Sequence, residues 1–156
     1  TGDNSKDGRS QVSQGELQSI PDFSAKDIEG NKVDNSIFKE NKVTLVNVWA
    51  TWCGPCVNEL PEIQKVYSEL KDQGIGVVGI VADGNDAKDT AKELIELESL
   101  KYKMIIPDSN LEKKLISTLR GFPTSYVVDS EGKILGMKLG GMNAEGFKAF
   151  IEQYAK

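Results

Sequence analysis

The sequence predicts an α/β domain in which a mixed central sheet lies between layers of helices. Strand patterns and amphipathic helical patterns alternate along the chain, which ends in a strand hairpin followed by a helix. Residues 43–49 and 75–82 are nearly continuous apolar runs, typical of strands that are covered on both faces. The 156 residues suit one domain, and its predicted bounds are residues 21–156.

The first half of this domain is expected to hold a hairpin, a buried strand and a long helix. Residues 21–33 form the hairpin, because a Glu-Gly-Asn turn separates two short strand patterns. The strand at 43–49 leads directly into a helix over about residues 54–72. Pro61 lies inside this helix and is expected to kink it. The apolar residues of the helix recur at helical spacing: Leu60, Ile63, Val66, Tyr67 and Leu70.

The second half continues the alternation of strands and helices. After the strand at 75–82, the pattern predicts a helix over 86–99, a strand over 102–106, one or two helical turns around 111–116, a hairpin of strands 125–128 and 133–139, and a last helix with Phe147, Phe150, Ile151 and Tyr154 on its inner face.

Residues 1–20 differ from the rest in composition and are predicted to be a flexible tether. They are rich in Gly, Ser, Asn, Asp and Gln, and the first residue is not a methionine. We therefore expect a mature exported protein that is held at a membrane by an anchor. A sequence trimmed at its start would have the same appearance.

Composition argues against several classes of function. The formal net charge is −5 and no basic cluster is present, which disfavours binding to nucleic acid or to an anionic membrane. No apolar run approaches the ~18–20 residues needed to cross a bilayer. The chain contains no histidine, so the commonest general base and the commonest metal ligand are both missing.

The only two cysteines, Cys53 and Cys56, lie between the buried strand and the long helix. As a purely structural disulfide, so short a loop would contribute only about 2 kcal/mol, and a domain of this size does not need it. A structural zinc site needs four ligands, and only two thiolates and no histidine are present. Haem attachment is excluded because Val57 stands where that motif needs a histidine.

A redox couple explains the cysteine pair better. The strand–turn–helix pattern places Cys53 at the helix N-terminus, where unpaired N–H groups and the helix dipole favour an anion. This effect lowers the pKa of a thiol from about 8.5 to roughly 7–8. Cys56 lies deeper in the first turn, so we expect it to be more protected and to react second.

Three segments together resemble a known family. They are PDFSAKDIEGNKV, LVNVWATWCGPCVNELP and GFPTSYVVDSEGKI, and the similarity runs from about Pro21 to the end of the chain. As a set they are similar to the TlpA/ResA branch of the thioredoxin superfamily, which comprises extracytoplasmic, often membrane-anchored thiol–disulfide oxidoreductases. The resemblance implies a thioredoxin-like fold with an N-terminal β-hairpin and a helix–strand insert between about residues 84 and 107.

The resemblance also implies roles for individual residues. Cys53 would be the attacking thiolate, Cys56 the resolving cysteine, and Glu59 the acidic residue of the CxxCxxExP pattern. Pro123 would be a cis-proline facing the disulfide. The residues that shape the turn, the rim and the substrate groove would be Trp52, Gly54, Pro55, Phe122, Pro123 and Thr124.

Each of these roles has a plainer alternative. Glu59 could be a solvated charge on an exposed helix face, although its i, i+3 spacing from Cys56 places the two side by side. Without the resemblance, Pro123 would be expected to be trans. Trp49 is expected in the core and Trp52 at the border of the site. Asn47 stands where thioredoxins carry a buried aspartate, so Glu59 is the only nearby candidate base.

The functional expectation is an oxidoreductase that reduces disulfides of exported proteins. The resemblance implies a membrane-embedded electron donor and no metal or organic cofactor. Apocytochrome c, methionine sulfoxide reductases and peroxidases are the substrate classes it offers, and we expect a monomer. Phe122 is bulkier than the residue common at its position and is expected to narrow the substrate groove. A peroxiredoxin-like antioxidant and a non-catalytic interaction module are the alternatives.

Overall fold

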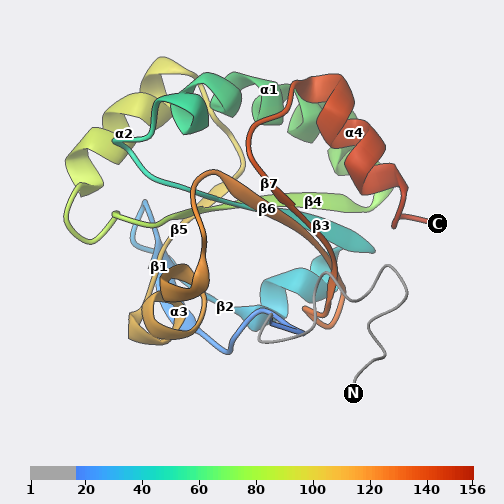
Figure 1. Cartoon of the computed structure of the whole chain (residues 1–156), viewed down its shortest axis with the longest axis horizontal. Helices are drawn as coiled ribbons and strands as arrows, with labels where there is room; N and C mark the ends of the chain where they lie inside the picture. Colours follow the sequence, from blue (N-terminus) through green and yellow to red (C-terminus); the bar gives the residue numbers. More distant parts are fainter. Residues whose placement is uncertain (1–16) are drawn as a thin grey trace.

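A computed structural model describes residues 17–156 and contains a seven-stranded mixed sheet (Figure 1). The strands follow the order β2-β1-β5-β4-β3-β6-β7 across the sheet. Their bounds are β1 Ser24–Asp27, β2 Lys32–Asp34, β3 Val43–Trp49, β4 Ile75–Val81, β5 Lys103–Ile106, β6 Thr124–Asp129 and β7 Ile134–Leu139.

Helices cover both faces of the sheet. The helices α1 (Gly54–Leu70), α2 (Lys88–Leu97) and α4 (Ala144–Glu152) lie on one face, and α3 (Ser109–Lys114) lies on the other (Figure 1). Three short 3₁₀ segments complete the structure: η3 Asn35–Glu40, η4 Lys71–Gln73 and η5 Ile116–Thr118. Two apolar clusters result, one between the sheet and α1 with α4, and one between the sheet and η3 with α3.

Strand β3 is the centre of the sheet and carries the site at its end. All seven of its side chains are buried, because it pairs with β4 in parallel and with β6 in antiparallel while helices cover both faces. The side chain of Leu45 enters the cluster under α1, and that of Val46 enters the cluster on the α3 side. The chain leaves β3 at Trp49 and starts α1 only five residues later, at Gly54.

The structure confirms the predicted α/β class, the N-terminal hairpin and the helix–strand insert. β1 and β2 pair in antiparallel across a turn in which Gly30 has φ +92°, a conformation that favours glycine. The insert consists of α2 and β5, and β5 joins the hairpin to the rest of the sheet. The helix predicted over 86–99 is shorter, Lys88–Leu97, and α1 continues through Pro61 to Leu70.

The predicted tether falls largely outside the described residues, because the description starts at residue 17. Ile20 is buried, and its backbone N–H donates to the carbonyl of Gly132. Ser19 forms an isolated bridge with Lys133 beside β7. Within residues 17–156, none of the helices has the length and apolar character that a membrane crossing requires.

Candidate active site

The cysteine pair occupies the first turn of α1, and the two sulfurs are joined in a disulfide. Cys53 is the N-cap residue in extended conformation, and its Sγ accepts a hydrogen bond from the backbone N–H of Cys56 at 3.3 Å. Pro55 lies in the first turn, where a missing N–H leaves no intrahelical bond unmade. A side chain at Gly54 would meet no atom within 4 Å, so crowding does not require a glycine there.

The two cysteines differ in their access to solvent. Cys53 is 5% exposed, whereas Cys56 is 0% exposed and packs in the cluster under α1. Gly54 and Pro55, which lie between them, are both exposed. Cys53 is therefore the more accessible of the two, and the order in which they react stays a prediction.

The loop before β6 lies beside the cysteine loop. Trp52, directly before Cys53, is 70% exposed, and its ring meets that of Phe122 edge to face at a centroid distance of 5.7 Å. The Phe122–Pro123 peptide bond is cis, as the resemblance implied. Thr124 is buried, and its hydroxyl donates to the carbonyl of Gly121 at 2.7 Å, which closes the turn around the proline.

Glu59 is buried one turn along α1 from Cys56, so it is not the solvated charge that its helix position allowed. Its side chain is 3% exposed. Oε1 accepts from Asn47 Nδ2 at 3.0 Å, and Oε2 accepts from the backbone N–H of Met142 at 2.9 Å. Burial raises the pKa of Glu59 from 4.5 to about 7, against the opposing effect of these two hydrogen bonds.

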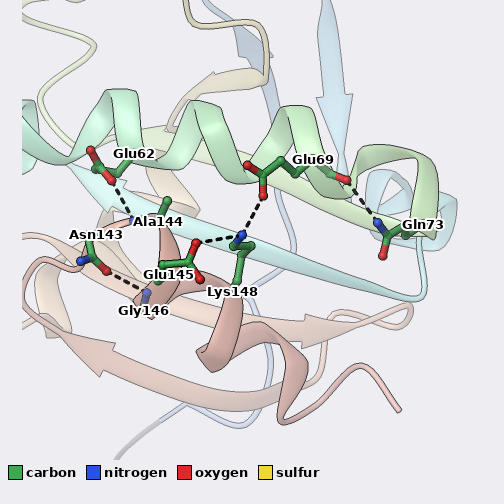
Figure 2. A network of polar contacts seen from close by, with 8 residues as sticks. All are labelled: Glu62, Glu69, Gln73, Asn143, Ala144, Glu145, Gly146 and Lys148. Atoms are coloured by element: carbon green, nitrogen blue, oxygen red, sulfur yellow. Dashed lines mark hydrogen bonds and ion pairs between the residues drawn. The ribbon is translucent and has the colours of Figure 1, made fainter.

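Two further carboxylates of α1 bind α4, Glu62 on the turn after Glu59 and Glu69 near the end of the helix (Figure 2). Glu62 Oε1 accepts from the backbone N–H of Ala144 at 2.8 Å, and Glu69 Oε1 binds Lys148 Nζ at 2.8 Å. Asn143 caps α4 by accepting from the N–H of Gly146 at 2.9 Å. The segment 142–144 is therefore bound to α1 through Glu59 and Glu62.

Sequence reasoning missed several residues that build the site. Ser125 accepts from Asn47 Nδ2 at 3.0 Å, and both side chains are completely buried. Asp83, after β4, accepts from the backbone N–H of Thr51 at 3.0 Å and from its hydroxyl at 2.6 Å, which fixes the loop that leads to Cys53. A polar residue at position 47 and another at 125, inside apolar strands, were the available signals. The contact of Met142 is through its backbone and leaves no trace in the residue type.

The described part of the chain contains no cluster of side chains that could bind a metal ion. No group of three Cys, Asp or Glu side chains within residues 17–156 is close enough to hold one. A cavity of about 490 Å³ is lined by Thr44, Ile75 and Gly76, from the starts of β3 and β4, and by Tyr102. The cysteines follow the opposite end of β3, so this cavity is separate from the disulfide.

Comparisons with known proteins agree with this geometry. The AhpC/TSA family model matches residues 17–137. The thiol–disulfide oxidoreductase ResA of Bacillus thuringiensis subsp. konkukian is 30% identical over 136 residues, which cover 87% of this chain and 74% of that protein. The thioredoxin-like protein YneN of Bacillus subtilis is 32% identical over 130 residues, which cover 81% of this chain and 73% of that protein.

The fold also matches a solved structure. A thioredoxin-family thiol:disulfide interchange protein from Chlorobium tepidum superimposes with a TM-score of 0.77 at 23% identity, over 92% of this chain and all of that one. This likeness confirms the thioredoxin-like fold, and the relative ResA is the one that is named a thiol–disulfide oxidoreductase. The chain belongs to the AhpC/TSA family and is a thiol–disulfide oxidoreductase of the ResA kind.

Proposed function

We propose that the protein reduces disulfides of exported partner proteins by dithiol–disulfide exchange through Cys53 and Cys56. The observation that supports the proposal is the disulfide at the start of α1, in which Cys53 is slightly exposed and Cys56 is completely buried. Helix N-termini stabilise thiolates, so Cys53 is the sulfur that attacks at neutral pH.

The exchange proceeds in two steps that balance in atoms and electrons. The Cys53 thiolate attacks one sulfur of the target disulfide, a new bond forms between them, and the second target sulfur leaves as a thiolate that takes up a proton. Cys56 then loses its proton and attacks Cys53 Sγ. The mixed disulfide breaks, the first target sulfur leaves, and two electrons have passed from the protein to the target.

Glu59 is the proposed proton acceptor for Cys56. It lies three residues further along α1, its carboxyl is buried, and the chain has no histidine for this task. A carboxyl with a pKa of about 7 exchanges protons near neutral pH, as a general base for a thiol requires.

The exposed rim around Cys53 is the proposed docking surface for the partner. Trp52 and Phe122 meet edge to face above it, and Gly54 and Pro55 leave the turn open to solvent. The proposed surface includes the adjoining turn with Pro123 and Thr124, and we expect Phe122 to narrow the substrate groove there. Aromatic side chains with large exposed faces are common at protein interfaces.

We place this reaction outside the cytoplasm, in a protein that is anchored at a bacterial membrane and acts as a monomer. The disulfide made in each cycle then has to be reduced by a membrane-embedded electron donor. Exported apocytochrome c, methionine sulfoxide reductases and peroxidases remain the proposed substrate classes. The absence of a third cysteine supports this location, because a further thiol would scramble disulfides in an oxidising compartment.

Two measurements test the proposal. The reduction potential of the Cys53–Cys56 couple, measured by equilibration in thiol buffers and mass-tagging of free thiols, should lie near the roughly −270 mV of a reductant. A value near about −120 mV would identify an oxidant and overturn the direction of electron flow.

The order of attack is tested with a peptide that carries one disulfide. The Cys56→Ser variant should accumulate a covalent adduct that dithiothreitol releases, because nothing resolves the mixed disulfide. The matched Cys53→Ser variant should form none, since the remaining thiol is buried. An adduct with Cys53→Ser and not with Cys56→Ser would reverse the two roles.

A further inference from the structure

Three polar side chains from three different elements meet in the core beneath α1. Asn47 on β3 and Ser125 on β6 are 0% exposed, and Glu59 on α1 is 3% exposed. Asn47 and Ser125 are direct partners in the antiparallel register of β3 and β6, which places their side chains together. Asn47 Nδ2 donates to Glu59 Oε1 and to Ser125 Oγ, both at 3.0 Å.

In this arrangement Asn47 donates both of its amide hydrogens in hydrogen bonds. An ionised carboxylate can only accept, so the amide nitrogen has to face Glu59 and the amide oxygen has to point away. Within residues 17–156, Asn47 Oδ1 is buried without a hydrogen-bond partner. The amide of Asn47 is therefore oriented with its oxygen unpaired and its nitrogen donating to Glu59 and Ser125. The hydrogen bond to Ser125 holds the amide in that orientation.

Burial disfavours the charged form of Glu59, whereas its two hydrogen bonds favour that form. Oε1 accepts from Asn47 and Oε2 from the N–H of Met142. Both donors bond more strongly to the ionised carboxylate than to the protonated acid, so both lower the pKa of Glu59. The N–H of Met142 is part of the backbone, whereas the amide of Asn47 belongs to a side chain that can be substituted. Asn47 is thus the side chain that opposes the uptake of a proton by Glu59.

The other groups that face Glu59 offer it no positive charge. Cys53 and Cys56 lie on its own helix, and Gly141 lies close enough that a Cβ there would be 3.2 Å from Oε2. Tyr102, from the segment before β5, is a buried phenol whose pKa is raised by burial and by the negative charge of Glu59. Among the described residues no lysine or arginine forms an ion pair with Glu59.

We propose that Asn47, oriented by its second hydrogen bond to Ser125, is a positioning residue that directs one amide hydrogen at Glu59 and so sets the pH range in which this carboxyl can exchange a proton. The inference rests on the proposed function, because the pH range affects the reaction only if Glu59 accepts the proton of Cys56. It extends the site from the first turn of α1 to two neighbouring strands of the sheet.

The test follows the Glu59 carboxyl directly, by ¹³C NMR titration of the oxidised protein, in which the cysteines do not titrate. Asn47→Asp keeps the shape of the side chain but replaces the donor with a second acid. Two carboxyls that share one site are pushed apart in pKa, so the upper midpoint should rise by about one pH unit or more. Ser125→Ala should move the midpoint of Glu59 in the same direction by a smaller amount.

Two further variants make the result specific. The double variant Asn47→Asp/Glu59→Gln exchanges the donor and the acceptor of this hydrogen bond. Its glutamine amide on α1 donates to the aspartate carboxylate on β3, and the oxygen of that amide still accepts from the N–H of Met142. One carboxyl should then titrate alone, below the upper midpoint of the Asn47→Asp protein. Thr44→Val removes another buried hydroxyl from β3, on the face away from α1, and should leave the midpoint of Glu59 unchanged.

The outcomes separate this inference from the proposed function. A Glu59 midpoint that stays within about 0.2 pH units in both Asn47→Asp and Ser125→Ala overturns the role of Asn47. A midpoint that moves as expected supports that role. If it moves while the pH dependence of the attack of Cys56 on the mixed disulfide does not, the positioning by Asn47 stands and the proton transfer from Cys56 to Glu59 is wrong.

Discussion

Glu59 shows how one buried carboxyl makes the stability of this fold depend on pH. Its pKa is about 7 in the folded protein against an ordinary value of 4.5. Between these two values the folded state holds a proton that the unfolded state has lost. The contribution of Glu59 to stability is therefore complete below pH 4.5, falls as the pH rises through this window, and levels off above pH 7.

Replacing Glu59 with glutamine should remove this fall. The wild-type protein is expected to lose roughly 3 kcal/mol of unfolding free energy between the two pKa values, and the Glu59→Gln protein should lose much less. Urea unfolding of the oxidised protein at several pH values measures the difference. Glu62→Gln, on the next turn of α1, is the matched control and should keep the wild-type pH dependence. Parallel curves for wild type and Glu59→Gln would contradict the raised pKa.

At the scale of the elements, α4 packs on α1 through apolar side chains, and polar contacts between the two helices add to this packing. Asn143 caps the helix, Glu62 accepts from the N–H of Ala144, and Lys148 bridges Glu69 and Glu145 near the surface (Figure 2). The cap and the Glu62 contact use backbone N–H groups that the helix itself leaves unpaired. The lysine contacts are partly exposed and contribute little.

The N-cap of α4 should therefore matter more than its salt bridge. Asn143→Ala is expected to lower the unfolding free energy by about 1 kcal/mol, whereas Asn143→Ser should retain most of it. Lys148→Ala should change it by no more than about 1 kcal/mol and less at high salt. Thermal unfolding at two salt concentrations distinguishes the two contributions. A larger effect of Lys148→Ala than of Asn143→Ala would reverse this ranking.

The elements were predictable where the pattern is local. β3 has the predicted bounds because its seven apolar or compact residues are contiguous, and α1 was predicted from its apolar spacing. η3 was missed because only Phe38 in it is buried, which leaves no periodicity. The hydrogen-bond partners of Glu59 were harder to predict from the sequence, because Met142 lies 83 residues away along the chain and only the fold brings it near.

For the whole molecule, the central sheet joins two apolar layers into one cooperative unit. Leu45 on β3 enters the layer under α1, and Ile80 on β4 enters the layer on the α3 side. Both side chains are almost completely buried. Since β3 and β4 pair along their full length, loss of one layer exposes the other.

Core substitutions in either layer should destabilise the whole protein. Leu45→Ala and Ile80→Ala are each expected to lower the unfolding free energy by about 2–5 kcal/mol. In both variants, far-UV circular dichroism and the NMR methyl signals of the two layers should be lost at the same urea concentration. Loss of the methyl signals of one layer ahead of the other would show that the layers unfold separately.

The two tryptophans give the protein two separate optical probes. Trp49 is 0% exposed in the core, whereas Trp52 is 70% exposed beside Cys53. Their fluorescence should accordingly differ, with a short-wavelength component from Trp49 and a long-wavelength component from Trp52. A partner that covers the rim of the site should shift only the long-wavelength component toward the blue. Docking can thus be followed in the unlabelled protein, in real time and apart from unfolding.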